Sequence, residues 1–530
     1  MFGVATSAFQ TEGAWDVDGK GPSMWDYVIR TNPDAINDKT NADIACNSYY
    51  LYKRDIEMLK ELGVKSYRFS ISWPRILPYG RPNYVNPAGI AHYNAIIDEL
   101  LANDIVPFVT MYHWDLPHNL NELGGWLNED IVDWFGDYAR VLFENFGDRV
   151  KYWLTINEPF IHCKLGYGVA VHAPLVKSPG VGFYECGRNI LLANAKAYHI
   201  YDDEFRTAQG GQVGLVFSMN WVEPASDSLD DYDAVLSVMA LFFRQYVDPI
   251  FSEHGNYPQL LIDRVAAASA EQNYESSRLR PFTDEQINYI KGTSDFFSLN
   301  TYGTDVVYRN ESLEGRFEVP SMNHDAYYDS YEMQFVPLNG SHDLKDYAPG
   351  FYKLLMYIKD NYNNPPIYIT ENGSSMKTLG LNDDDRVAYI RNYLSALFAA
   401  NLDGANVKGY HVWNLMDDFE WNRGYTLKMG LYEVDMTDPN RKRVPRKSAL
   451  VYKEIIRSRV IDYEYNPDPN RFALYEIDME DPARPRTPRK PAYVYQDIVK
   501  NRVIDFDYNP DLYVHTLTVA EVDSAEHIFK

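Results

Sequence analysis

Long apolar runs, basic residues and cysteines are scarce in this sequence, and each shortage excludes a class of protein. No run of eighteen apolar residues occurs among the 530 residues, which excludes a membrane-spanning helix. Acidic residues outnumber basic ones by 75 to 50, and the formal charge of −25 argues against nucleic acid and anionic membranes as partners, because like charges repel. The apolar fraction of 45% is still that of a globular protein with a large core.

The three cysteines, Cys46, Cys163 and Cys186, lie far apart in the sequence. Their spacing matches no metal-ligand pattern, and three residues cannot form a complete disulfide framework. The Gly-rich phosphate loop that would follow the first strand of a nucleotide-binding sheet is also lacking. We therefore expect no metal and no cofactor.

The first residues lack the features of a secretory signal. Residues 1–6 are largely apolar, but neither a basic segment nor a cleavage-like site accompanies them, so we predict a strand that begins without a lead-in. We expect part of the natural N-terminus, including any signal peptide, to be missing from this sequence. N-x-S sequons at Asn310, Asn339 and Asn372 favour secretion, although so short a pattern also arises by chance.

Short β-branched and aromatic runs alternate with longer amphipathic stretches along the chain. In one such stretch Tyr52, Ile56, Leu59 and Leu62 share a helical face and Gly63 ends it. Eight strands each followed by a helix predict a single-domain α/β fold, a (β/α)₈ TIM barrel. The predicted strands are residues 2–9, 64–71, 105–112, 150–156, 212–218, 295–299, 366–370 and 407–415.

A second helix is predicted over residues 131–146, before Gly147, because its apolar residues recur at helical spacing. Polar and aromatic residues follow most of the predicted strands. In a barrel these strand ends point to one face, where the connecting loops build the site. The residues concerned are Gln10, Arg68, His113, Trp114, Asn157, Glu158, Asn300, Glu371, Asn372 and Trp413.

The C-terminal part of the chain contains a tandem duplication. Residues 431–467 recur as residues 474–510, with 23 of 37 positions identical at a spacing of 43 residues. A closed barrel has no free edge, so we predict that the barrel spans residues 1–467 and that the second copy lies outside it, in an extension of residues 468–530. This copy can pack as a strand–helix appendage, exchange with the first copy, or remain mobile.

Three glutamates stand out among the 75 acidic residues because aromatic and amide residues surround them. Glu158 follows WLTIN and precedes Pro159, Glu371 follows IYIT and precedes Asn-Gly, and Glu420 lies between Phe419 and Trp421. A single glutamate at a strand end is more often a helix or loop ion-pair partner. A pair of carboxyl groups that flank one bond is what glycoside hydrolysis requires.

The strings around these glutamates resemble the two signatures of glycoside hydrolase family 1. Asn157-Glu158-Pro159 is similar to the NEP motif, and Thr370-Glu371-Asn372-Gly373 is similar to the TENG motif. The resemblance extends over about residues 1–467. Further matching strings begin at Phe9 (FQTEG), Tyr67 (YRFSISW), Tyr112 (YHWDLP), Asn300 (NTY) and Trp413 (WNLMDDFEW).

The resemblance implies a retaining β-glycosidase, most simply a β-glucosidase, that acts by double displacement on a β-glucoside or oligosaccharide. Glu158 would be the acid/base and Glu371 the nucleophile, with carboxyl groups roughly 5–5.5 Å apart. Arg68, Tyr302 and Asn300 would support the nucleophile, Arg68 by favouring its ionised form. The pKa of Glu158 is expected to rise through burial and the charge on Glu371.

The resemblance also implies a set of sugar-binding residues. Glu420 is informative among them, because family members that take 6-phosphoglycosides have a serine there. An acid at this position repels phosphate, so we expect an unphosphorylated sugar. Asn157 is expected to bond the 2-hydroxyl group and Trp413 to stack on the ring. The full set is Gln10, His113, Trp114, Asn157, Trp413, Glu420 and Trp421.

Three positions depart from the family pattern. Asn414 and Asp418 stand where serine and asparagine are more common, and Met429 stands where an aromatic residue is usual. The loop of residues 321–350 is expected to form part of the wall that contacts the aglycone.

Several alternatives remain open at this point. A thioglucosidase or transglucosidase could use the same scaffold, although plant-type thioglucosidases have glutamine where Glu158 stands. A catalytically silent sugar-binding barrel typically lacks one of the two glutamates, and an inactive product of the duplication is a third alternative. The sequence leaves open the aglycone, the preference among glucose, galactose and fucose, and the oligomeric state, for which a dimer is possible.

Overall fold

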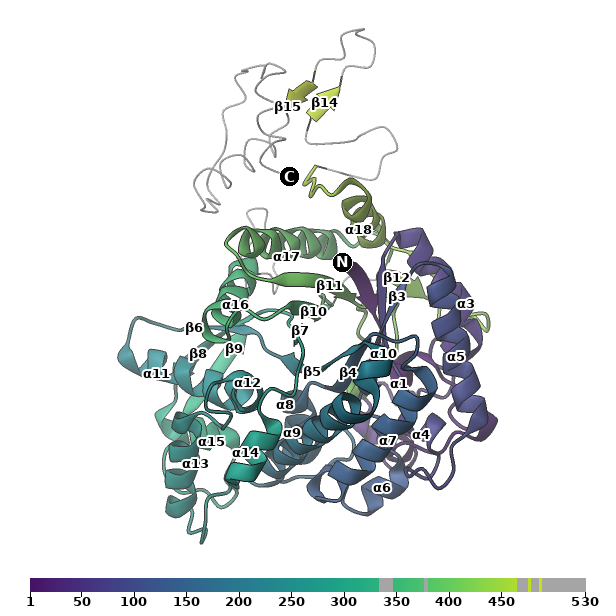
Figure 1. The fold of residues 1–530 in the computed structure, drawn as a ribbon. Coiled ribbons are helices and arrows are strands. Elements are labelled where there is room, and N and C mark those ends of the chain that lie inside the picture. The colour runs from purple at the N-terminus through teal and green to yellow at the C-terminus, as the bar shows by residue number, and fades with distance from the viewer. Residues whose placement is uncertain (333–346, 376–379, 465–474, 478–485, 489–530) are drawn as a thin grey trace. The chain divides into compact units, whose positions relative to one another are not determined.

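The computed structural model describes residues 1–332, 347–375, 380–464, 475–477 and 486–488. The chain divides into two compact units, Met1–Ala449 and Leu450–Lys530. In the first unit a ring of helices surrounds a closed barrel of parallel strands (Figure 1).

The eight barrel strands pair in the order in which they occur along the chain, and the first closes on the last. All eight predicted strands are present, which confirms the (β/α)₈ barrel. Their alternating sequence pattern is weak because strands of a parallel barrel are buried on both faces. The strands are β1 (Phe2–Ala5), β2 (Ser66–Ser70), β3 (Val106–Tyr112), β4 (Tyr152–Asn157), β5 (Gln212–Ser218), β7 (Phe297–Asn300), β10 (Ile367–Asn372) and β11 (Val407–Trp413).

The predicted first strand is wrong in its second half. The strand ends at Ala5, and Ala8–Thr11 form the short helix α1. The hydroxyl of Ser7 donates to the side chain of Gln10 at 2.6 Å, which favours the turn. The turn also brings Phe9 parallel to Trp421, with ring centroids 5.9 Å apart.

Both predicted amphipathic helices are confirmed, as α3 (Ser48–Leu62) and α7 (Ile131–Phe146). Gly63 ends α3 with φ +75°, a conformation that costs glycine little. The other helices of four or more residues in the first unit are α2 (Met24–Thr31), α4 (Trp73–Ile76), α5 (Pro87–Ala102), α6 (His118–Glu122), α8 (Pro159–His162), η4 (Cys163–Gly168), α9 (Gly182–Ile200), η5 (Tyr201–Phe205), α10 (Arg206–Gln209), α11 (Leu229–Val238), η6 (Met239–Arg244), α12 (Gln245–Phe251), α13 (Gln259–Glu271), α14 (Asp284–Ile290), α15 (Met322–Ala326), α16 (Ala348–Asn361) and α17 (Asp384–Leu402).

The barrel interior is filled with apolar side chains near the start of its strands. Phe108, Leu154, Val216, Phe296 and Tyr368 form one buried cluster there. Each such side chain contributes about 1.5–3 kcal/mol through burial, so this end of the barrel is packed core. A site can therefore form only toward the opposite, carboxyl ends of the strands.

A small sheet outside the barrel was not predicted from the sequence. It consists of β6 (Trp221–Pro224), β8 (Thr304–Arg309) and β9 (Tyr328–Glu332), which lie in the connections after β5 and β7. Part of the predicted loop of residues 321–350 is thus α15, β9 and the start of α16. Residues 333–346 of that loop lie outside the described part of the chain.

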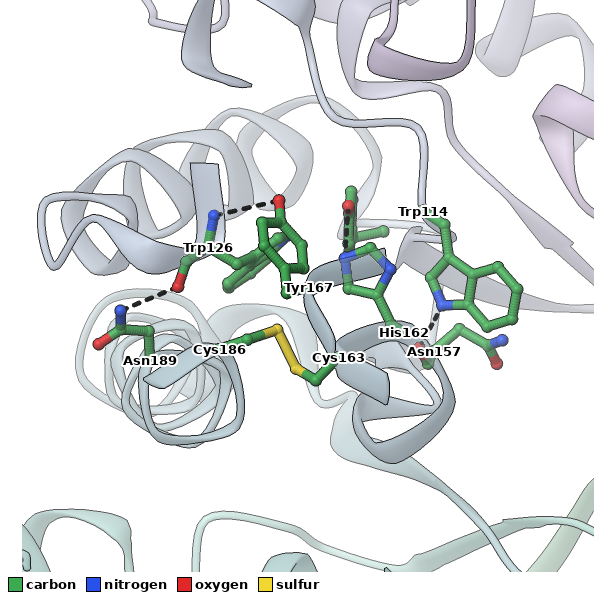
Figure 2. Close-up of a disulfide and its surroundings, with 9 residues drawn as sticks. Trp114, Trp126, Asn157, His162, Cys163, Tyr167, Cys186 and Asn189 are labelled. Atoms are coloured by element: carbon green, nitrogen blue, oxygen red, sulfur yellow. Dashed lines mark hydrogen bonds between the residues drawn. A yellow bond between two sulfur atoms is a disulfide. The ribbon is translucent and has the colours of Figure 1, made fainter. Parts of the chain in front are cut away.

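A disulfide joins Cys163, at the start of η4, to Cys186 in α9 (Figure 2). This pairing was not predicted, because two cysteines 23 residues apart carry no signal of their own. The bond fixes the segment that follows β4 to a long helix of the outer ring. The remaining cysteine, Cys46, is buried, and its Sγ donates to the backbone oxygen of Asp417 at 3.0 Å.

The helical stretch Leu229–Phe251 is long and apolar enough, by length and composition, to cross a membrane. It consists of α11, η6 and α12, and 72% of its most apolar window is buried inside the protein. That burial is the property of a core helix, so the stretch is weak evidence for a membrane span.

The duplicated segments contain the same hairpin. In the first unit β12 (Tyr432–Val434) pairs antiparallel with β13 (Arg443–Pro445). In the second unit β14 (Tyr475–Ile477) pairs with β15 (Arg486–Pro488) in the same register, 43 residues later. The helix α18 (Lys447–Ser458) follows the first hairpin and spans the boundary of the units. The other residues of the second copy lie outside the described part of the chain.

Candidate active site

A cavity of about 540 Å³ lies at the carboxyl ends of the barrel strands. Nine of the twelve predicted site residues line it, which explains why they recur at strand ends. Its inner wall is formed by His113, Trp114, Asn157, Glu158, Tyr302, Glu371, Trp413, Glu420 and Trp421.

Glu371, at the end of β10, is held at both carboxyl oxygens. The guanidinium of Arg68 forms an ion pair with Oε1, and the hydroxyl of Tyr302 donates to Oε2 at 2.5 Å. Burial and the charge on Glu371 raise the pKa of Tyr302 well above its usual value, so this hydroxyl stays protonated and donates. Two donors, one of which is a cation, thus fix the position of this carboxyl group.

Arg68 is fully buried behind the cavity, where an unpaired cation would be costly. Its guanidinium also donates to Oδ1 of Asn157 at 2.6 Å and to Thr110 at 3.1 Å. These bonds satisfy the charge and set the positions of two cavity residues, Glu371 and Asn157. Arg68 therefore supports the site from behind these residues and does not line the cavity.

Glu158 differs from Glu371 because no cation contacts it. Asn300 donates to its Oε1 at 2.8 Å, and no ion pair is recorded for it among the described residues. Burial, followed by the charge on Glu371, raises the pKa of Glu158 to about 8. The carboxyl group is therefore protonated at neutral pH.

The backbone at Glu158 is strained. Its φ of +47° lies in the left-handed region, which costs a residue with a β-carbon about 1–3 kcal/mol. The N–H of Glu158 still bonds to Val216 of β5, and Pro159 starts α8 directly afterwards. This turn aims the side chain into the cavity. Trp114 and Trp421, which also line the cavity, have positive φ values of 71° and 49°.

His113 and Asn157 form a second polar pair. The amide of Asn157 lies 3.1 Å from Nε2 of His113, and its oxygen is already used by Arg68 and Asn300. The amide nitrogen must therefore donate to Nε2, which leaves the proton of His113 on Nδ1. Burial, followed by the charge on Arg68, lowers the pKa of His113, so the ring is neutral. Among the described residues Nδ1 has no hydrogen-bond partner.

Glu420 is the third acid of the cavity. Gln10 donates to its Oε2 at 3.2 Å from behind, so Gln10 orients Glu420 and does not itself line the cavity. Burial and the charge on Glu371 raise the pKa of Glu420 to about 8. Asn300, like Gln10 and Arg68, stands behind the wall.

Aromatic side chains surround these acids. The indole of Trp114 donates to the backbone oxygen of Asn157 at 2.8 Å (Figure 2). Trp413 packs with Ala5 and with Met429, the residue that replaces the usual aromatic. The two other departures from the family pattern contact each other, since Asn414 donates to Asp418 at 2.7 Å.

Much of the remaining cavity lining was not predicted from the sequence. The loop of residues 321–350, expected to contact the aglycone, does contribute Tyr328 and Ser330, and Met429 also lines the cavity. Ser218 ends the predicted strand of residues 212–218 and Asn220 follows it, so the strand-end argument could have found both. The other side chains come from connections and from the outer sheet, and no local pattern marks them. They are Phe160, Ile161, Lys164, His172, Met219, Val222, Val238, Phe242, Asp305, Val307 and Leu427.

The sequons differ in what the fold allows. Asn372 is fully buried and donates to Thr301 at 2.7 Å, so it cannot accept a glycan in the folded protein. Asn310 is half-buried, and Asn339 lies outside the described residues.

Among the described residues no group of three or more His, Cys, Asp or Glu side chains could hold a metal ion.

The family model described as Glycosyl hydrolase family 1 matches residues 1–461. The chain belongs to this family. It is 42% identical to human Cytosolic beta-glucosidase over 462 residues, which cover 86% of this chain and 96% of that protein. The solved structure of aphid myrosinase superposes with a TM-score of 0.82 and 40% identity, covering 86% of this chain and 98% of that one.

Human Lactase/phlorizin hydrolase is a longer relative. It is 42% identical over 461 residues, which are 86% of this chain but only 24% of that protein. This family 1 chain thus spans about a quarter of the lactase/phlorizin hydrolases that it matches and 96% of human Cytosolic beta-glucosidase. The match stops close to the end of the first duplicated copy.

Proposed function

We propose that this family 1 chain is a retaining β-glucosidase that cleaves unphosphorylated β-glucosides by double displacement. The observation that carries the proposal is that two glutamates of one cavity have opposite environments. Glu371 is paired with a cation, whereas Glu158 is buried without one and has a raised pKa. Two carboxyl groups whose environments separate their ionisation can divide the roles of nucleophile and acid.

In the first half of the reaction Glu371 attacks the anomeric carbon while Glu158 protonates the leaving oxygen. Arg68 and Tyr302 hold the attacking carboxylate in place. The C–O bond to the aglycone breaks, a glycosyl ester of Glu371 forms, and the alcohol leaves with the proton of Glu158.

In the second half Glu158 acts as a base. The ester has consumed the charge on Glu371, which is the second cause of the raised pKa of Glu158. The pKa of Glu158 then falls, and its carboxylate can take a proton from the water that attacks the ester. Release of the sugar restores both groups, with retention of the β-configuration.

The remaining inner-wall residues suit a neutral sugar. The Nδ1 proton of His113 is free to donate to a hydroxyl group, and Glu420 can accept from others. Trp413 offers a flat apolar face for the sugar ring. The carboxylate of Glu371 lies in the same small cavity, so a phosphorylated sugar would be repelled.

The proposal is tested with purified protein and three β-glucosides whose leaving groups are 2,4-dinitrophenol, 4-nitrophenol and phenol. Glu371→Gln should abolish turnover of all three. Glu158→Gln should lower kcat/KM about 10²–10⁴-fold for the phenyl glucoside and much less for the dinitrophenyl one, which needs no proton. Glu144→Gln, at an exposed site on α7, is the matched control.

Proton NMR of the first-formed anomer completes the test. The β-anomer is expected, and an initial α-anomer would exclude double displacement. Equal losses for all three substrates in Glu158→Gln would remove the acid/base role. Parallel assays on galactosides and fucosides would show whether glucose is preferred.

A thioglucosidase is the second candidate, because of the similarity to aphid myrosinase. Glu158 disfavours it, since a thiolate leaves without a proton whereas an alkoxide does not. We expect 4-nitrophenyl 1-thio-β-glucoside to be hydrolysed at least about a hundred-fold more slowly than its oxygen analogue. The reverse order would favour the thioglucosidase.

A further inference from the structure

Lys164 is the one lysine or arginine among the described residues that line the cavity. It lies in η4, directly after the disulfide-bonded Cys163 and six residues after Glu158. The bond to α9 fixes the backbone on which Lys164 stands. Lys164 lines the cavity together with Phe160 and Phe242.

The surroundings of the Lys164 ammonium are aromatic. Nζ lies 5.4 Å from the ring centre of Phe160 and 5.2 Å from that of Phe242. These two rings are 4.2 Å apart, and Tyr328 contacts Phe242 with ring centres 5.3 Å apart. The aromatic faces attract a cation but supply no hydrogen-bond acceptor.

The ammonium group of Lys164 has no acceptor within the described part of the protein. Among the described residues its ammonium group has no hydrogen bond and no ion pair, although it carries three donors. Asp305 is the acid whose charge acts on it, and that carboxylate accepts from Asn220 at 3.3 Å. Burial nevertheless lowers the pKa of Lys164, and the charge on Asp305 offsets this effect only in part.

This cation stands where a departing aglycone must pass. Phe160 and Lys164 lie on the continuous helical segment α8–η4, which Glu158 directly precedes. All three residues line the same cavity. An aromatic aglycone can therefore lie against Phe160 and Phe242 while its glycosidic oxygen faces Glu158. Its far end then reaches the ammonium group.

We propose that Lys164 is a specificity-determining residue that binds a carboxylate, or a comparable anionic group, at the far end of an aryl aglycone. The proposal rests on the β-glucosidase function proposed above and names the class of aglycone. The aromatic side chains would pack against the aryl ring, and the ammonium group would bind the anionic group. An acceptor there would restore the hydrogen bonds that burial has removed.

Three substrates separate charge recognition from shape: the 4-carboxyphenyl, 4-carbamoylphenyl and phenyl β-glucosides. The wild-type protein should prefer the carboxylate. Lys164→Met should lower kcat/KM about ten-fold for the carboxylate and less than about two-fold for the amide and the phenyl glucoside. Lys164→Arg should keep most of the preference. Dividing the kcat/KM of each variant by that of the wild type for the same substrate cancels the different leaving-group acidities.

Two further variants act as controls. Lys177→Met removes a positive charge from an exposed site outside the cavity, so it should not change the ratios. Asp305→Asn removes the neighbouring acid and should increase the preference for the carboxylate. A thermal melt of Lys164→Met identifies loss of fold, and in that case Lys164→Arg and Asp305→Asn carry the test.

The outcomes distinguish the two proposals. Equal losses for all three substrates in Lys164→Met would show that Lys164 only supports the aromatic wall, which overturns the inference. Hydrolysis of all three without any carboxylate preference would overturn it as well and leave the β-glucosidase proposal standing. Failure of the wild-type protein to hydrolyse any of them would overturn the β-glucosidase proposal itself.

Discussion

The side-chain amide of Asn300 donates a hydrogen bond of 2.8 Å to Oε1 of Glu158. Its own oxygen accepts from the hydroxyl of Thr370 at 2.7 Å, which fixes the amide with its nitrogen toward the acid. A donor at this place favours the ionised form of Glu158 and opposes the effect of burial on its pKa. Asn300 therefore keeps that pKa from rising further.

Asn300→Ala should move the alkaline limb of the pH profile. Without the amide the pKa of Glu158 rises above about 8, so the acid stays protonated to higher pH. We expect kcat/KM at the optimum to fall about ten-fold, because the carboxyl group also loses its orientation. The measurement is kcat/KM against pH for the phenyl β-glucoside. Thr370→Val, which keeps the amide, should give a smaller shift, and an unchanged limb in Asn300→Ala would contradict the contact.

Glu158→Gln should stabilise the protein at alkaline pH. The pKa of Glu158 is about 8 in the folded protein, against roughly 4.3 for an unperturbed glutamate. Between these values the folded state binds more protons than the unfolded chain, so the free energy of unfolding falls as pH rises through this window. A glutamine at this position does not titrate, so the variant does not show this loss of unfolding free energy with rising pH. We expect its advantage to grow from near zero at pH 4 to the order of a few kcal/mol at pH 8.

Urea unfolding at both pH values checks this expectation, with Glu144→Gln as the exposed control. A difference between Glu158→Gln and the wild type that does not change with pH would show that burial does not raise the pKa of Glu158. Glu420→Gln should behave in the same direction, since its pKa is also raised to about 8.

The double variant Cys163→Ala/Cys186→Ala should lose about 3 kcal/mol of unfolding free energy, the usual effect of opening a loop of this length. Because the loop carries Lys164, kcat/KM for the 4-carboxyphenyl β-glucoside should also fall. Reductant gives an internal control: it should lower the stability of the wild-type protein to that of the variant and leave the variant unchanged. A wild-type protein indifferent to reductant would contradict the disulfide.

A chain that ends at Pro467 should be as active as the full chain, within about two-fold, because all described residues that line the cavity lie before that point. A chain that ends at residue 430 should fail to fold. It lacks Arg446, which pairs with Asp417 through bonds of 2.9 and 2.7 Å, and Arg443, which bonds to Asp55 at 2.8 Å. Circular dichroism and turnover of both chains give the answer, and inactivity of the longer one would assign a role to the second copy.

The inner wall of the site could be predicted because its residues stand at strand ends. Glu158 and Glu371 follow buried apolar runs, and a parallel barrel gathers such ends at one face. Gln10 shows the limit of this argument: it was placed at the end of a strand, but the chain turns at Ser7 and carries it behind Glu420.

The outer wall could be predicted only in part, as the loop of residues 321–350, because the positions of its side chains depend on tertiary packing. Phe242 lies in a helix and Tyr328 in a small sheet, and they meet Phe160 only once the connections have folded. The pairing of Cys163 with Cys186 has the same origin, since it needs η4 to pack against α9. Lys164 follows a cysteine in sequence and carries no motif of its own.

The seclusion of Cys46 has a practical consequence for handling the protein. Burial, followed by the charge on Asp418, raises the pKa of its thiol well above the usual value, so the reactive thiolate is scarcely populated. The native molecule should tolerate peroxide and alkylating reagents such as iodoacetamide without losing turnover. Cysteine-directed inhibitors and labels should then react with Cys46 only after the polypeptide unfolds.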